Sequence, residues 1–204
     1  MDPTPTAAPR GRNPRGKGER LREDIVESAL ALLDELGDDQ ALSLRAVARR
    51  TNIAATSVYI HFADRNALVL AAMERCHHEL VRAVDETERD SEDPVDRLRA
   101  RTLLLGAWAQ EHPGLYRVLH ESTVNQSPGM PFRQELADRS TLAVQRCMDA
   151  GLAPVDDPAL IALDLRAAVH GAVSMRLSQP DLPWPSLEDQ VDRFLTRLVG
   201  VRLR

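Results

Sequence analysis

The sequence predicts an all-α fold of about nine helices, and three observations lead to this prediction. Aromatic residues make up only 3% of the 204 residues, so the core must consist mainly of Leu, Ala, Val and Met, which suit helices better than strands. No glycine, the residue that commonly interrupts helices, occurs between Gly37 and Gly106. Apolar residues recur at three- and four-residue steps, without an alternating strand pattern or an internal repeat. We therefore expect a small N-terminal helical unit and a larger C-terminal one.

The chain begins with a polar segment. Residues 1–20 are rich in Pro, Gly and Arg and poor in apolar residues, which predicts a disordered basic arm. From Leu21 onward, apolar residues repeat at helical spacing as far as Leu36. Gly37 then stands where a C-terminal cap is expected, so the first helix should end there.

Two short helices and a long one are expected next. Ser43 is a good N-cap for the first, and Thr51-Asn52 follows where that helix should stop, because Asn tolerates a left-handed turn. The second short helix is expected over residues 56–62, and the long one after Asn66 as its N-cap. The long helix would carry one apolar stripe, formed by Val69, Met73, Cys76, Leu80 and Val84.

The remaining helices have recognisable starts and ends. Asp93-Pro94 and Asp157-Pro158 each combine an N-cap with a proline at the first helical position. Gly151 is expected to end the helix predicted over residues 131–150. Apart from the two helices that begin at these prolines, the C-terminal segments expected to be helical are 115–122, 131–150 and the segment from Leu187 to Val201.

The formal net charge of -5 is unevenly distributed along the chain. Residues 1–66 contain ten basic and ten acidic side chains, whereas residues 67–204 contain sixteen and twenty-one, which accounts for the whole deficit. Within the first part, residues 40–66 contain four Arg and one Asp. The acidic total is therefore an average over opposed regions, and it does not exclude a nucleic-acid partner for the N-terminal unit.

Other functional classes are disfavoured by what the sequence lacks. It contains no run of about 18 apolar residues, so we expect no membrane span and no membrane partner. The N-terminus has no apolar segment typical of a secretory signal, which favours a cytoplasmic location. Cys76 and Cys147 are far apart and outside any C-x-x-C spacing, which predicts two buried thiols and neither a disulfide framework nor a zinc site.

Residues 42–68 have the pattern of a helix-turn-helix, in which two short helices are joined by a tight turn. The second short helix would present small hydroxyl residues and one Tyr to solvent. Small residues at its start would let its N-terminus enter the DNA major groove. The residues expected to form the core of this unit are Leu44, Val47, Ala48, Ile53, Val58 and Phe62.

The second short helix contains the run Thr56-Ser57-Val58-Tyr59-Ile60-His61-Phe62, followed by Arg65 and by Ala67-Leu68. In residue type, spacing and position this run resembles the DNA-binding domain of the tetracycline-repressor (TetR) family of bacterial transcription regulators. The resemblance covers about a third of the chain. It departs from the family pattern at Thr51-Asn52, where Ala-Gly is usual, and at Ala54 and Ala55, where polar side chains are frequent.

The resemblance implies a transcriptional regulator that binds double-stranded operator DNA. For Arg49 and Arg50, a solvated helix face is as good an explanation as phosphate contact. For Tyr59, partial core packing is an alternative, and the arm could either contact DNA or serve only as a solubilising tail. The residues to which the resemblance assigns DNA contacts are Arg45, Ala55, Thr56, Ser57, Tyr59, His61 and Arg65.

The C-terminal part carries a second, shorter resemblance. WAQEHPGLYRVL at positions 108–119 and Val169-His170-Gly171 resemble a TetR subfamily marked by a Trp-His-Gly (WHG) triplet, with Val in place of Trp. The family resemblance thus divides the chain into an arm at 1–20, a helix-turn-helix DNA-binding domain at 21–66, and a ligand-binding and dimerisation domain at 67–204. It implies a regulator, most simply a repressor, that binds a palindrome as a homodimer.

Two sets of residues are expected to serve this C-terminal domain. An unknown small-molecule effector would bind among aromatic, His and Met side chains, although core packing is an alternative for each of them. Those side chains are Trp108, Tyr116, His120, Met148, His170 and Met175. Small and apolar residues near the C-terminus would form the dimer interface. They are Ala167, Ala168, Gly171, Leu187, Val191, Phe194, Leu198 and Val201.

Competing interpretations have less support in the residues. Glu74 and His77 have the i, i+3 spacing of di-iron bundles, with Cys76 and His78 beside them, but such sites need further ligands, so we expect no metal and no cofactor. No nucleophile-base pair or phosphate-binding loop is present, which argues against a helical-bundle enzyme and against any catalytic residue. An activator of the same fold and a helical protein-interaction module remain as alternatives.

Overall fold

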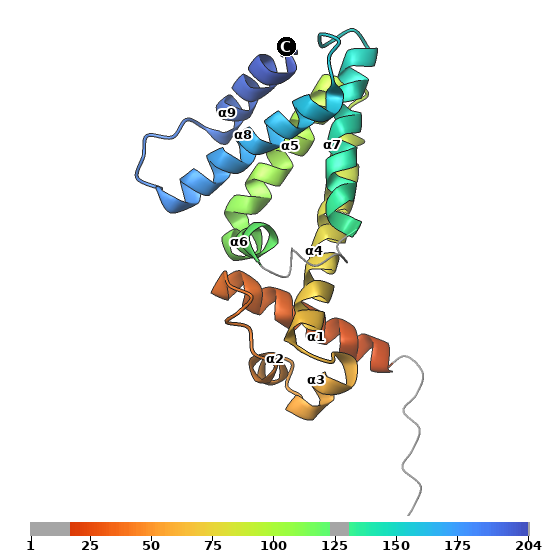
Figure 1. Cartoon of the computed structure of the whole chain (residues 1–204), viewed down its shortest axis with the longest axis vertical. Helices are drawn as coiled ribbons and strands as arrows, with labels where there is room; N and C mark the ends of the chain where they lie inside the picture. Colours follow the sequence, from red (N-terminus) through yellow and green to blue (C-terminus); the bar gives the residue numbers. More distant parts are fainter. Residues whose placement is uncertain (1–16, 123–130, 204) are drawn as a thin grey trace, which may run out of the picture.

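The computed structural model describes residues 17–122 and 131–203, and within these residues all regular secondary structure is helical (Figure 1). The predicted fold class is confirmed for this part of the chain, whereas residues 1–16 of the predicted arm lie outside it. None of the described helices combines the length and the apolar character needed to cross a membrane. The elements are α1 (Lys17–Leu36), α2 (Leu44–Arg50), α3 (Ala55–His61), α4 (Arg65–Glu88), α5 (Pro94–Glu111), α6 (Pro113–Glu121), α7 (Pro131–Asp149), α8 (Pro158–Ser178), α9 (Leu187–Phe194) and the π-helical turn η2 (Leu195–Val199).

Local sequence signals set several helix ends, as predicted. The Ser43 hydroxyl accepts a hydrogen bond from the backbone N–H of Ala46 at 3.2 Å and caps α2. Asn52 adopts the left-handed conformation, with φ at 58°, in the turn that follows α2. Asp93 and Asp157 cap α5 and α8 ahead of the prolines that open those helices. Each of these signals depends only on neighbouring residues, which is why the sequence alone reveals it.

The predicted starts of α1 and α4 are wrong. α1 begins at Lys17, so the last four residues of the predicted arm are helical, and Glu19 in the first turn is favourably placed near the positive end of the helix dipole. Asp64, not Asn66, is the N-cap of α4, because its carboxylate accepts a hydrogen bond from the Ala67 N–H at 2.8 Å. Both helices therefore start slightly earlier than expected.

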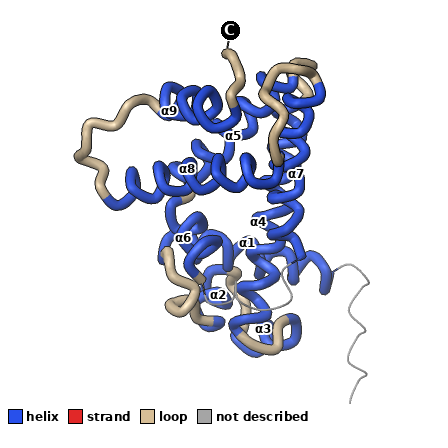
Figure 2. The backbone as a smooth tube through the Cα atoms, turned by 45° about the horizontal axis from the view of Figure 1, so that its top comes forward, coloured by secondary structure: helices blue, strands red, loops and turns tan. Residues whose placement is uncertain are grey.

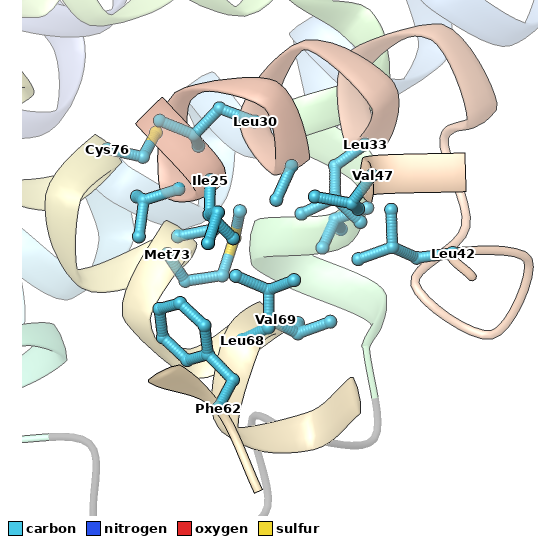
Figure 3. Packing of buried hydrophobic residues seen from close by; sticks show 14 of the residues in the cluster. Ile25, Leu30, Leu33, Leu42, Val47, Phe62, Leu68, Val69, Met73 and Cys76 are labelled. Atoms are coloured by element: carbon cyan, nitrogen blue, oxygen red, sulfur yellow. The ribbon is translucent and has the colours of Figure 1, made fainter. Parts of the chain in front are cut away.

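The N-terminal unit has one hydrophobic core, which α1, α2, α3 and α4 share with Leu115 and Val118 of α6 (Figure 3). Ile25 of α1 and Leu68 and Met73 of α4 are fully buried in it. The residues predicted for the helix-turn-helix core are buried, except Ile53, which is half-buried against it. α4 contributes side chains as far as Leu80, so this core continues beyond the predicted domain boundary.

The C-terminal unit is a bundle of α5, α7, α8 and α9 with η2 around a second core (Figure 1). Leu98, Val144 and Leu195 are among its fully buried side chains. The loop between α8 and α9 stands clear of the bundle (Figure 2). Arg176 of α8 holds this loop by donating a hydrogen bond to the carbonyl oxygen of Pro185 at 2.8 Å.

Candidate functional site

α2 and α3 form the predicted helix-turn-helix. The turn between them is closed by a hydrogen bond from the backbone N–H of Ile53 to the carbonyl oxygen of Ala48 at 2.9 Å. Val58 is fully buried on the inner face of α3, and Phe62 enters the core directly after the helix. α3 is therefore held by one face, and its opposite face is left to solvent.

The residues predicted to contact DNA lie on α2, on α3 and at the start of α4. The exposed ones are Arg45, Thr56 and Tyr59, and the half-buried ones are Ala55, Ser57, His61 and Arg65. Tyr59 exposes 57% of its surface, so core packing is not its main role. α3 begins with the small residues Ala55 and Thr56, so no bulky side chain stands at its N-terminal end.

Sequence reasoning missed one residue of this surface, Ile60, which exposes 80% of its area on α3. Its spacing could have revealed it. Val58 and Phe62 are four residues apart and face the core, so the residue midway between them on a helix must point away. An apolar side chain this exposed, next to Tyr59, extends the surface that α3 presents.

The arginines around the helix-turn-helix play different structural roles. Arg65 is partly engaged within the protein, since it donates hydrogen bonds to the Gln40 carbonyl oxygen at 3.0 Å and to Asn66 Oδ1 at 3.1 Å. Arg50 forms an exposed ion pair with Glu35 at 2.7 Å, which adds little to stability. The structure thus favours the solvated-face explanation for Arg50 and leaves Arg45 and Arg49 exposed on α2.

The C-terminal unit is anchored to α1 at the start of α6. The carboxylate of Asp34 accepts hydrogen bonds from the backbone N–H groups of Gly114 and Leu115, both at 3.1 Å, and its other oxygen lies 2.8 Å from Nδ1 of His112. A carboxylate in this position stabilises the positive end of the helix. The backbones also meet closely, because a Cβ atom on Gly114 would lie only 1.8 Å from the Asp34 carbonyl oxygen.

A cavity of about 170 Å³ lies among α4, α5, α6, α7 and α8. Four of the predicted effector residues line it, namely Trp108, Tyr116, His120 and His170. Met148 does not, because it is buried within the core formed by α5, α7, α8 and α9. Met175 does not either, because it faces solvent on α8.

Three of these cavity residues form one aromatic and polar cluster. The hydroxyl of Tyr116 and Nδ1 of His170 are hydrogen bonded at 2.5 Å. The His120 ring lies 4.5 Å from each of the other two rings, measured between centroids. Burial raises the pKa of Tyr116 to about 12, so its hydroxyl stays protonated near neutral pH. This bond joins α6 to α8.

Sequence reasoning missed two buried polar residues of the cavity wall, His77 and Arg101. His77 of α4 has Nε2 at 3.5 Å from a carboxylate oxygen of Glu135, and burial lowers its pKa. Arg101 forms an ion pair with Glu88 at 2.9 Å. The sequence does not indicate that either side chain is buried. An Arg on a helix is normally exposed, and the spacing around His77 suggests only a metal ligand.

The predicted dimer residues fall into two groups. Val191 and Val201 are buried in the core of the same chain, so they offer no exposed apolar area to a partner. The half-buried ones are Ala168, Gly171, Leu187, Phe194 and Leu198, and Ala167 is exposed. On α8, Leu160 and Leu163 add exposed apolar area that the prediction missed. The exposed apolar face of this region therefore lies on α8, not on α9.

Both cysteines are buried free thiols, as predicted. Burial raises the pKa of Cys76 to about 12 and that of Cys147 to about 11, which keeps both protonated and weakly reactive near neutral pH. Glu74 and His78 are exposed, whereas His77 is buried, so the three side chains do not converge. Within residues 17–122 and 131–203, no three His, Cys, Asp or Glu side chains are grouped as metal ligands would be.

Comparisons with known proteins agree with this architecture. Residues 25–72 match the profile of bacterial regulatory proteins of the tetR family, and residues 98–201, about half of the chain, match the tetracyclin repressor-like C-terminal domain. The nucleoid occlusion factor SlmA of Cronobacter sakazakii is 22% identical over 160 residues, covering 75% of this chain and 81% of SlmA.

Solved structures share the fold over nearly the whole chain. A protein with unknown function from Rhodococcus sp. RHA1 has a TM-score of 0.77 at 23% identity and covers 93% of this chain and 99% of its own. SmeT, the repressor of the Stenotrophomonas maltophilia multidrug efflux pump SmeDEF, has a TM-score of 0.68 at 24% identity, with 88% of each chain covered, and a SmeT-triclosan complex is equally similar. With both its N-terminal and C-terminal parts matched, this chain belongs to the TetR family of bacterial transcriptional regulators.

Proposed function

We propose that this protein is a ligand-responsive repressor that binds palindromic operator DNA as a homodimer and releases it when a small molecule fills the C-terminal cavity. TetR-family regulators bind DNA, dimerise and bind small ligands, and in general they are not enzymes. The observation that carries the proposal is the geometry of α3. Its inner face is fixed by Val58, while Thr56 and Tyr59 remain exposed beside Arg45. An activator of the same fold is the alternative.

In this proposal, α3 lies in the major groove with Tyr59 and Ile60 against the groove walls or base edges. Ala55 and Ile60 offer apolar contacts suited to thymine methyl groups, and Thr56 offers a hydroxyl. Arg45, Ser57 and His61 bind phosphate oxygens at the sides. Arg65 contributes mainly by position, because it ties the start of α4 to the loop before α2.

The proposed function divides the chain into a DNA-binding domain and an effector-binding domain. Residues 21–66 bind DNA and residues 67–204 bind the effector and dimerise, with α4 serving both because its side chains reach both the N-terminal core and the cavity. We assign the C-terminal domain to the WHG subfamily. The hydrogen bond between Tyr116 and His170 supports this assignment, because the two residues come from the two segments that resemble the subfamily.

Transmission of the signal would run through two helices of the cavity wall. α6 contributes Tyr116 and is seated on Asp34 of α1 by hydrogen bonds, so a ligand that displaces α6 also displaces the DNA-binding unit. α4 contributes His77 to the same cavity and enters the N-terminal core. A ligand can favour release only if it binds the released geometry more tightly than the DNA-bound one. SmeT, a repressor with a triclosan complex, provides a structural precedent at the level of fold.

Selection from a random DNA pool tests this function. The purified full chain should enrich one palindromic sequence, with two half-sites about one helical turn apart or a multiple of it, because a two-fold symmetric dimer presents two copies of α3. Binding of the enriched site and of a scrambled site of equal composition should then be compared at the same salt concentration. If the chain shows no preference for any sequence over competitor DNA, the proposal fails.

The proposed dimer interface gives a separate prediction. Leu163 exposes 56% of its surface on the face of α8 that also carries Leu160 and Ala167. We expect Leu163→Asp to weaken dimerisation by about 2–4 kcal/mol, because a carboxylate would be buried without a partner at a two-fold contact. Sedimentation equilibrium should therefore detect a monomer at concentrations where the unaltered chain is a dimer.

Val155→Asp is the matched control, because Val155 is 91% exposed in the segment between α7 and α8 and is not part of α8. It should leave the dimer intact. A dimer that tolerates Leu163→Asp as well as it tolerates Val155→Asp would place the interface elsewhere on the molecule.

A further inference from the structure

Arg101 is a buried cation in the wall of the cavity. Only 3% of its surface is exposed, and it lies in the middle of α5. One terminal nitrogen, Nη1, donates to a carboxylate oxygen of Glu88 at 2.9 Å and to the carbonyl oxygen of Arg139 at 3.0 Å. These two acceptors hold the guanidinium from the side of α4 and α7.

The other terminal nitrogen of Arg101, Nη2, is also buried but has no hydrogen-bond acceptor among the described residues. A buried N–H of a charged group without an acceptor is costly, so native proteins seldom leave one unsatisfied. Burial lowers the pKa of Arg101, which is consistent with a guanidinium whose charge is only partly compensated. Arg101 lines the cavity, and its Nη2 is a donor that no described residue uses.

The charges around the cavity favour an anion as the missing acceptor. Among the described lining residues, Arg101 and Arg166 carry permanent charges, and no carboxylate lines the space. The acids that act on Arg101 are already engaged: Glu88 pairs with Arg101 itself, and Asp85 pairs with Arg139, as does Glu135. A ligand carboxylate would therefore meet positive groups without a facing acid on the wall.

The hydroxyl groups of the wall are bonded within the protein. The hydroxyl of Thr102 donates to the Leu98 carbonyl oxygen at 2.6 Å, and that of Ser140 donates to the Leu136 carbonyl oxygen at 2.8 Å. The Tyr116 hydroxyl is bonded to His170. Of the two guanidinium groups in the wall, that of Arg101 is the buried one, and its Nη2 is a donor that no described residue uses.

Size and shape restrict the rest of the ligand. A volume of about 170 Å³ is close to the engineered cavity of about 150 Å³ that holds one benzene molecule. Leu105 and Trp108 continue the wall along α5 from Arg101. Arg101 and Trp108 are separated by seven residues, or about 10 Å along the helix, which a single ring with one acidic substituent can span.

We propose that the effector is a small aromatic carboxylic acid with a single ring, whose carboxylate accepts a hydrogen bond from Nη2 of Arg101 and whose ring packs against Leu105 and Trp108. This inference rests on the proposed function, because it names the ligand class for the same regulatory cavity. A hydroxyl at the far end of the ring would meet the polar cluster of Tyr116, His120 and His170.

The test compares acids with their uncharged analogues on the full chain. Benzoate and 4-hydroxybenzoate should bind, measured by calorimetry and by an increase in melting temperature that depends on ligand concentration. Benzamide and 4-hydroxybenzamide have nearly the same shape without the charge, and they should bind about tenfold more weakly or worse. Equal binding of acids and amides, or no binding of either acid, overturns the proposal.

Variants locate the contact. Arg101→Met combined with Glu88→Gln removes both members of the buried ion pair, and it should lower benzoate affinity about tenfold or more. Arg99→Met is the matched control, because Arg99 lies on the same helix and pairs with Asp192 at 2.6 Å outside the cavity. If the double variant keeps the affinity of the unaltered chain, the contact is refuted. If the double variant does not fold, the comparison of acids and amides on the unaltered chain still decides.

Failure of this inference is distinguishable from failure of the proposed function. A chain that selects a palindrome but binds none of the acids remains a regulator with a different effector, and the inference is wrong. A chain that binds benzoate through Arg101 but has no DNA preference keeps the ligand site, and the regulatory function is wrong.

Discussion

Replacing Gly114 with alanine should lower the free energy of unfolding by about 3 kcal/mol, among the largest effects expected of a single methyl group in this protein. A Cβ at this position would lie 1.8 Å from the carbonyl oxygen of Asp34, and that obstacle is backbone, not a flexible side chain. α6 would have to move away from α1. The hydrogen bonds from Gly114 and Leu115 to the Asp34 carboxylate would then be lost.

Thermal unfolding measures this effect directly, and a decrease of about 6–12 °C in melting temperature is expected for a chain of this size. Gly18→Ala is the matched control. Gly18 lies in the first turn of α1, and a Cβ there meets no atom within 4 Å, so the same chemical change should shift stability by less than about 1 kcal/mol. Equal melting temperatures for the two variants would mean that α6 is not seated on α1 as described.

Replacing Tyr59 with alanine should weaken operator binding by about 2–6 kcal/mol, which is at least about 30-fold in affinity. Each half-site contact of this kind is worth about 1–3 kcal/mol, and a symmetric dimer loses it twice. Tyr59 exposes 57% of its surface on α3, so the substitution should leave helicity, dimerisation and melting temperature nearly unchanged. Fluorescence anisotropy with the selected palindrome gives the affinity.

Two further variants define what Tyr59 contributes. Tyr59→Phe keeps the ring and removes the hydroxyl, so a hydrogen bond to DNA would appear as an intermediate loss of affinity. Val155→Ala removes exposed apolar area far from α3 and should bind as the unaltered chain does. Full operator affinity in Tyr59→Ala would rule out the proposed placement of α3 in the major groove.

The sequence reveals most about features that depend on neighbouring residues. Ser43 and Asn52 mark the start of α2 and the turn after it, because each acts on the backbone at or beside its own position. The burial of Val58 and Phe62 follows from their four-residue spacing on α3. For the same reason, the exposure of Ile60 on the opposite face follows from the spacing alone.

Contacts between distant segments could not be predicted in this way. Asp34 and Gly114 are 80 residues apart, and neither residue type indicates that the two backbones meet. An amphipathic C-terminal helix indicates an apolar face but not whether that face meets its own chain or a partner, so the pattern alone does not predict that Val191 lies in the core of its own chain. The burial of Arg101 depends on Glu88 of another helix, and sequence spacing carries no record of that pair.

α4 contributes side chains to both the N-terminal core and the effector cavity. This limits where the chain could be divided to build a chimera with another TetR-family regulator. Cutting the chain at residue 66 would separate Leu68, Met73 and Leu80 from the α1 side chains of the same core. These three side chains would then be exposed to water. A transplanted DNA-binding unit would therefore need α4 through Leu80, together with an α6 whose first turn fits Asp34. The part of the chain that would have to be exchanged to transfer DNA specificity therefore ends within α4, and not at a linker between domains.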